Sequence, residues 1–203
     1  TSFLFIASIP LGALSVTVSH KVAYLFGKYT KEKAKSYLDQ TLPFTLLSST
    51  ILSLFWLALT PFLMNFFHYG TFLPFIFFTP IWVIGLLSAN YGGFLQGILS
   101  FGKLGIISVS EVLVKLAVAV LLIKIGLRDY IVLTIPISML ISLLITWKVV
   151  SGTKTESLES SESRFNKSFF TASILSGIST ISFLGVDIIL AKHFLYNIYD
   201  SYL

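Results

Sequence analysis

Long apolar runs separated by short polar stretches cover most of this 203-residue chain. No charged residue lies between Asp39 and Lys103, and a soluble fold could not leave so long a stretch uncharged because its exterior must be solvated. A lipid bilayer favours this pattern, since a charge at mid-membrane costs about 2.5–3.5 kcal/mol on insertion scales. The pattern predicts transmembrane helices over six segments: 2–26, 42–67, 73–99, 104–125, 130–150 and 169–193.

The composition strengthens this interpretation. The chain is 55% hydrophobic and 11% charged, against roughly 25% charged residues in soluble domains. We therefore predict an all-α, polytopic membrane helix bundle of about six transmembrane helices. Cysteine is absent, which excludes a disulfide framework, thiol catalysis and a zinc–thiolate site. The net charge of +5 does not indicate nucleic acid, because the lysines gather at helix ends and in loops.

The basic residues also predict the orientation. If the lysine-rich loop at 27–41 is cytoplasmic, the outer side receives only Lys124, Arg128 and Lys192. The Ser- and Glu-rich stretch after the fifth segment is then cytoplasmic too. The chain begins without Met and is apolar almost at once, so we interpret it as a piece of a longer protein rather than one opened by a secretory signal.

Small and polar residues align on single faces of several predicted helices. Close helix packing, which small residues permit in lipid, explains each stripe taken singly. Their recurrence on several spans also favours a shared polar interior, so both interpretations stay open. The stripes are Ser8, Gly12, Ser15 and Ser19; Ser49, Ser53 and Thr60; Asn90, Gly93, Gly97 and Ser100; and Ser173, Ser176, Thr180 and Asp187.

Two opposite charges lie inside the fourth predicted span. Ser108, Glu111 and Lys115 share one helix face, and the two charges are one turn apart, so they can neutralise each other in part. One interpretation is a structural ion pair that holds this helix to a neighbour. We favour the other, in which they line a water-filled cavity and contact a charged substrate or a proton. Asn90, on the preceding span, is a further candidate for the cavity wall.

Asp187 is the candidate for ion coupling. A partly desolvated carboxylate has a raised pKa and can exchange H⁺ or Na⁺, so one of these ions is the expected coupling ion. The alternative is an acid that reaches the outer interface and pairs with Lys192.

Enzyme chemistry and nucleotide binding find no support in the motifs. The run GILSFGK at 97–103 matches part of a phosphate-loop pattern, but Leu104 stands where Ser or Thr is required and no strand precedes it. No HExxH or GxSxG motif occurs. We expect no metal, no organic cofactor, no nucleotide and no enzymatic activity.

Two stretches carry a family resemblance. GFLQGILSFG at 93–102, followed by Glu111 and Lys115, is similar to a turn of the polysaccharide (lipid-linked oligosaccharide) flippases of the multidrug/oligosaccharidyl-lipid/polysaccharide exporter superfamily. VDIILAKHFL at 186–195 resembles the start of that family's second lobe, where an aspartate precedes a helix end of the A-K-x-F/L type.

The resemblance implies a domain organisation. The family has two six-helix lobes joined by a cytoplasmic linker, in a transporter of twelve to fourteen helices. This chain would cover helices two to seven: residues 1–150 would form most of the first lobe, 151–168 the cytoplasmic linker and 169–203 the truncated first helix of the second lobe. Such a fragment would be inactive alone.

The resemblance also implies a function. The protein would be a multi-pass protein of the cytoplasmic (inner) membrane that flips polyprenyl-pyrophosphate-linked oligosaccharides by ion-gradient-driven alternating access. Lys115 would contact the anionic pyrophosphate, Glu111 would hold Lys115 or carry protons, and Asp187 would bind the coupling cation. A multidrug/toxin cation antiporter of the same superfamily and a non-transporting membrane scaffold subunit are the alternatives.

Overall fold

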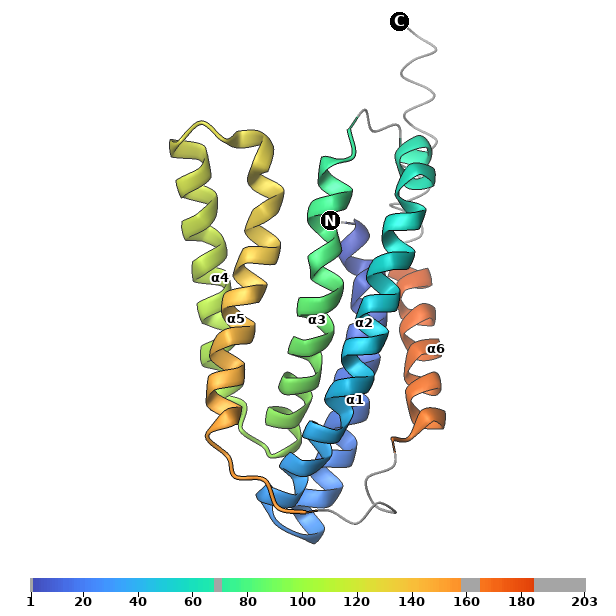
Figure 1. Ribbon diagram of the computed structural model, residues 1–203, viewed down its shortest axis with the longest axis vertical. Coiled ribbons are helices and arrows are strands. Elements are labelled where there is room, and N and C mark those ends of the chain that lie inside the picture. The colour runs from blue at the N-terminus through green and yellow to red at the C-terminus, as the bar shows by residue number, and fades with distance from the viewer. Residues whose placement is uncertain (1, 68–70, 158–164, 185–203) are drawn as a thin grey trace, which may run out of the picture.

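The computed structural model describes residues 2–67, 71–157 and 165–184, which are mostly helical (Figure 1). These described residues contain no β-strand, so the predicted all-α class is confirmed. In chain order the helices are α1 (Ser2–Lys28), α2 (Lys31–Phe67), α3 (Leu73–Gly97), α4 (Phe101–Lys124), the 3₁₀ helix η1 (Arg128–Leu133), α5 (Thr134–Ser151) and α6 (Lys167–Leu184).

Helix α3 occupies the middle of the bundle and contacts α1, α2 and α5. The α4–α5 hairpin lies on one side of α3, whereas α6 lies on the opposite side of the bundle and packs on α1 (Figure 1). The larger apolar core joins α1, α2 and α3, and its fully buried members include Val18, Leu25, Leu38 and Phe94. Helix α1 therefore has one face toward this core and another toward α6.

Five helical segments are long and apolar enough to cross a membrane: Ser8–Lys28, Lys31–Phe66, Phe75–Gly97, Phe101–Lys124 and Tyr130–Ser151. Large apolar side chains remain exposed on their outer faces, as on α4, where Val112 is 63% and Leu116 is 62% exposed. Such surfaces are stable in lipid but not in water. The chain is accordingly a multi-pass membrane protein. The sixth predicted span, 169–193, begins within α6, and its continuation past Leu184 lies outside the described residues.

The prediction of a loop at 27–41 was wrong. Helix α2 begins at Lys31, directly after Thr30, whose hydroxyl accepts the Lys33 N–H at 3.3 Å as a helix cap does. Tyr37 and the neighbouring Leu38 are fully buried, so this lysine-rich turn has an apolar face toward the core. Strong helix formers combined with one buried face make the stretch an amphipathic extension of the second helix.

The fifth predicted segment, 130–150, divides in two. Its first residues form the 3₁₀ helix η1, and the α-helix begins at Thr134. Pro136 falls in the first turn of α5, where a missing N–H leaves no helical hydrogen bond unmade. A proline therefore suits a helix that starts at this position.

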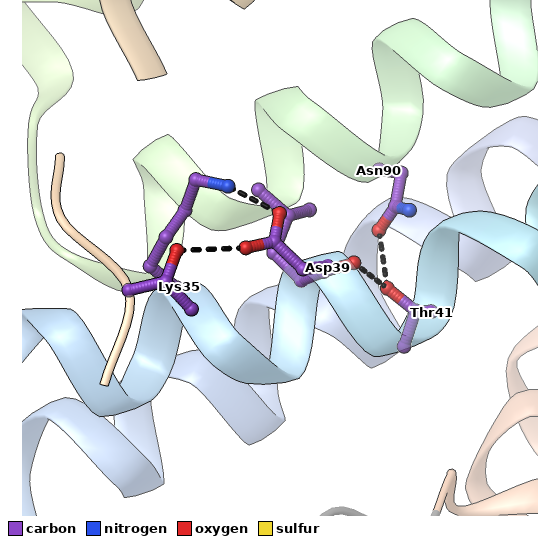
Figure 2. Close-up of polar contacts among 6 residues, drawn as sticks. Lys35, Asp39, Thr41 and Asn90 are labelled. Atoms are coloured by element: carbon purple, nitrogen blue, oxygen red, sulfur yellow. Dashed lines mark hydrogen bonds and ion pairs between the residues drawn. The ribbon is translucent and has the colours of Figure 1, made fainter. Parts of the chain in front are cut away.

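The segment after α5 is tied back to the start of α2. The Thr155 hydroxyl donates to Asp39 Oδ2 at 2.9 Å, and the Thr30 hydroxyl donates to Glu156 Oε2 at 3.2 Å. Asp39 also pairs with Lys35, which is largely buried (Figure 2). We call these contacts the α2 strap; they hold the polypeptide that leads toward α6 against the N-terminal part of α2.

Candidate functional site

The three predicted residues of the fourth span lie on α4. Ser108 is exposed, and Glu111 and Lys115 are half-buried. Within the described residues no ion pair joins Glu111 to Lys115, although they are one turn apart. Among the described side chains of α4 only Ile107 is buried, so most of the surface of this helix is exposed. Ser108, Glu111 and Lys115 do not line either of the two cavities described below.

Asn90 lies in a different place, the interface between α2 and α3. Its Nδ2 donates to Thr45 Oγ1 at 3.0 Å, and its Oδ1 accepts the Thr41 hydroxyl at 3.1 Å (Figure 2). All three side chains are buried. The structure thus gives Asn90 partners on α2 and does not bring it together with Glu111 or Lys115. Both threonine hydroxyls also bond backbone carbonyls of α2, Thr41 that of Leu38 and Thr45 that of Thr41, so the amide adds a polar contact between the two helices.

Asp187, the ion-coupling candidate, lies outside the described residues. Its role stays a prediction.

The glycines of α3 pack against α1. A Cβ built on Gly93 would meet the Ser15 carbonyl oxygen at 2.6 Å, and one on Gly97 would meet the Ser19 carbonyl oxygen at 2.8 Å. Only glycine permits two helix backbones to approach so closely. The packing interpretation of this Gly93/Gly97 pair is therefore confirmed, and the carbonyls of Ser15 and Ser19 belong to a tight interface.

The opposite face of α1 is hollow. A cavity of about 470 Å³ lies between α1 and α6, and its wall includes Ser8 and Gly12 from α1 with Ser173, Ser176 and Gly177 from α6. We call it the hydroxyl cavity. The polar stripes predicted for the first and sixth spans face each other here. The four-residue stripe on α1 is thus divided between a packed interface and a cavity.

A second cavity, of about 750 Å³, lies between the C-terminal part of α1 and the start of α6. We call it the basic cavity, and the two cavities together the α1–α6 seam. The basic cavity is bounded by His20, Lys21 and Tyr24 from α1 and by Asn166, Lys167 and Phe169 at the start of α6. His20 stacks on Phe169 with ring centroids 4.8 Å apart, so an aromatic contact joins the two helices at this point.

The lysines near this cavity lie against aromatic rings. Lys21 Nζ is 5.3 Å and Lys28 Nζ is 5.8 Å from the centre of the Tyr24 ring. A ring face attracts an ammonium group without neutralising it. In the part of the chain that the structure describes, no carboxylate lies within 4.0 Å of Lys21 or Lys167. The described lining of this cavity therefore contains two lysines and no carboxylate.

Lys21 also lies inside a membrane-crossing segment. It precedes Lys28, the end of that segment, by seven residues, which corresponds to about 10 Å along a helix. An ionisable side chain at such depth faces protein or a water-filled cavity and marks a functional site by default. Lys21 lines the basic cavity, which meets this expectation.

From the sequence, Lys21 and Lys167 are predicted to be ordinary charges at the cytoplasmic ends of their helices, and no role is predicted for His20. One signal was available, since His20 and Lys21 lie more than one turn inside an apolar run. Their juxtaposition with Lys167 depends on the packing of α6 against α1, which neither stretch reveals alone.

No protein-family model, curated protein or solved structure matches the chain. The class that the fold defines is a multi-pass helical membrane protein with a polar seam between α1 and α6. Its activity has to be argued from that seam.

Proposed function

We propose that this chain is part of a transporter that moves a polyprenyl-pyrophosphate-linked oligosaccharide across the cytoplasmic membrane by ion-gradient-driven alternating access. The observation that carries the proposal is the α1–α6 seam, where a hydroxyl-lined cavity and a cation-lined cavity lie along one helix pair in an otherwise apolar bundle. The family resemblance of residues 93–102 and 186–195 supports the same function.

The seam suits the three chemical parts of such a substrate. The Ser173 hydroxyl donates to the Phe169 carbonyl of its own helix and keeps lone pairs that can accept a hydrogen bond from a sugar hydroxyl. Lysines at the cytoplasmic end attract pyrophosphate. The exposed apolar side chains of the helices leave the polyprenyl chain in lipid. A transporter that combines these surfaces keeps the polar head out of hydrocarbon without burying the lipid tail.

The α4 face supplies a second polar surface in this proposal. Lys115 and Ser108 contact substrate, Glu111 positions Lys115 or carries protons, and Asp187 binds the coupling H⁺ or Na⁺. Asn90 has the structural role of joining α2 to α3.

A multidrug cation antiporter is the nearest alternative. A cationic substrate requires carboxylates in its path, and the described lining of the two seam cavities contains none while it contains Lys21 and Lys167. A scaffold subunit is the other alternative, and it predicts a seam that is closed to water.

Cysteine labelling separates transporter from scaffold, and the native chain has no cysteine to remove. We expect a membrane-impermeant maleimide to modify Gly12→Cys and Ser173→Cys in the full-length protein. The matched control is Ser138→Cys, because Ser138 on α5 is 0% exposed. Unlabelled seam positions alongside labelled surface cysteines would overturn the proposal. The same reagent on cysteines at 108, 111 and 115 decides whether the α4 face is also water-filled.

Export of lipid-linked oligosaccharide tests the substrate. Cells that depend on the full-length gene for export should lose this activity when the gene is deleted and regain it with the wild-type gene. Lys115→Ala should reduce export, and unchanged export would remove Lys115 from the mechanism. Efflux of organic cations without export of oligosaccharide would favour the antiporter.

A further inference from the structure

The basic cavity has the features of a binding site rather than of a packing defect. Its volume of about 750 Å³ falls within the roughly 300–1,000 Å³ range of small-molecule sites. Three basic side chains border it from two helices: His20 and Lys21 from α1 and Lys167 from the start of α6. Groups that are far apart in the sequence thus converge on one space.

Among the described residues, an aromatic ring rather than a carboxylate lies against the ammonium group of Lys21. Lys21 Nζ is 5.3 Å from the centre of the Tyr24 ring, which also borders the cavity. Lysines paired with carboxylates would have little remaining attraction for an anion. Lysines oriented by aromatic rings retain their charge and are available to a ligand.

We propose that the basic cavity binds the phosphate group of an inner-leaflet lipid. Ammonium groups bind phosphate as point charges, and two of them on opposite walls can contact a single phosphate or diphosphate. Asn166 adds an amide NH₂ donor, since its Oδ1 is already occupied by the Phe169 N–H at 3.0 Å. The ligand class is therefore a phosphomonoester or diphosphate anion.

The depth and the walls of the cavity favour a phosphate carried by lipid over a free one. Lys21 lies about 10 Å along the helix from Lys28, inside the membrane-crossing segment. Phe165 and Phe169 form an aromatic part of the wall. The cavity is lined by the C-terminal part of α1 and the start of α6. The lysine distribution predicts that these helix ends are cytoplasmic. A headgroup enters such a space while its chains stay in the leaflet.

This inference rests on the proposed function for the choice of a lipid-borne phosphate, and it assigns the phosphate contact to the basic cavity rather than to Lys115. Binding itself requires no transport, so the two can fail separately.

Native mass spectrometry of the full-length protein in detergent tests the site directly. The probes are dioleoyl phosphatidic acid, dioleoyl phosphatidylcholine and inorganic pyrophosphate. We expect phosphatidic acid to bind at least about tenfold more tightly than phosphatidylcholine, because the choline cation cancels the phosphate charge. Lys21→Gln and Lys167→Gln should each weaken phosphatidic acid binding about tenfold, which corresponds to about 1.4 kcal/mol.

Lys103→Gln is the matched control, since Lys103 is an exposed lysine at the cytoplasmic end of α4, outside the cavity. Circular dichroism of each variant establishes that the helices are retained. Equal binding of phosphatidic acid to the wild-type protein, both cavity variants and the control would overturn the site. Binding of inorganic pyrophosphate as tight as that of phosphatidic acid would overturn the lipid source.

Export assays on the same variants separate the two proposals. If the wild-type protein exports lipid-linked oligosaccharide but does not bind phosphatidic acid at the cavity, the site is refuted and the proposed transport function stands. Binding that is lost in Lys21→Gln, in a protein whose wild type exports no lipid-linked oligosaccharide, refutes the transport function and leaves the site intact.

Discussion

Helix α1 has two faces built from the same kinds of residue, and they behave differently. Toward α3, the carbonyls of Ser15 and Ser19 meet Gly93 and Gly97 with no space for a methyl group. Toward α6, the small residues of α1 border a cavity, and a Cβ added at Gly12 would meet nothing within 4 Å. One face is a rigid interface, and the other is an open seam.

The difference shows that a small-residue stripe has no fixed meaning in a membrane helix. Glycine on the opposite helix lets two backbones come into contact, which favours dispersion and weak Cα–H···O interactions. Between α1 and α6 the approach is uneven, because a Cβ at Gly177 would meet Ile9 Cγ2 at 3.1 Å whereas one at Gly12 would meet nothing within 4 Å. The partner decides the outcome.

Locking the seam should have the largest effect. A Cβ at Gly177 lies 3.8 Å from the Ile9 Cβ, which matches the mean spacing of about 3.8 Å in disulfides. We expect Ile9→Cys/Gly177→Cys to oxidise and to abolish export, with recovery after reduction. The two single cysteine variants serve as controls. Full export by the cross-linked protein would mean that the seam does not move during transport.

Crowding the rigid face should destabilise the fold. Gly93→Ala places a methyl group against a backbone carbonyl that cannot rotate away, so the free energy of unfolding should fall by about 1–3 kcal/mol. Denaturation in mixed micelles measures this change. Gly92→Ala is the control, because a Cβ there would meet nothing within 4 Å. Equal stability of the two variants would contradict the assignment of a tight interface at Gly93.

Removing the Asn90 amide should have a moderate effect. Asn90→Ala breaks the hydrogen bonds to Thr41 and Thr45, and we expect a loss of about 0.6–1.7 kcal/mol, from the average to the largest value typical of such bonds between membrane helices. The same denaturation assay applies. Ser138→Ala should cost less, since the Ser138 hydroxyl bonds only the Ile135 carbonyl of its own helix region. A larger loss for Ser138→Ala would place the critical polar contact on α5 instead.

Loosening the α2 strap should have the smallest effect on stability. Thr155→Val removes the hydrogen bond to Asp39, an exposed contact worth about 0.5 kcal/mol. Limited proteolysis of the segment after α5 should accelerate, while Thr153→Val, whose hydroxyl makes no described hydrogen bond, should leave the rate unchanged. Identical rates for both variants would show that this contact does not restrain the segment that leads to α6.

Much of the fold follows from residue patterns. The uncharged stretch between Asp39 and Lys103 and the other apolar runs predicted five of the spans in the described residues. The start of α2 could not be predicted from hydropathy, because lysines conceal the buried face formed by Tyr37 and Leu38. Helix ends defined by packing and capping are invisible to a scale that averages over a window.

The candidate site was less accessible. The sequence directed attention to Lys115 and Glu111, because a charge is most conspicuous inside the longest apolar runs. Lys21 and Lys167 looked like ordinary flanking lysines, and their meeting across a cavity depends on α6 packing against α1. A residue's distance from the end of its apolar run is a better signal than its charge alone.

The sequence by itself determined the solvent and the helical class, because these depend on hydrophobic free energy summed along the chain. It also predicted an orientation from the distribution of lysine and arginine. The tertiary structure decided which face of each stripe is packed and which is open. Helical periodicity assigns residues to a face, but it does not specify the helix opposite. Whether a serine meets a glycine or another serine is a property of the pair of helices, and that pairing created the α1–α6 seam.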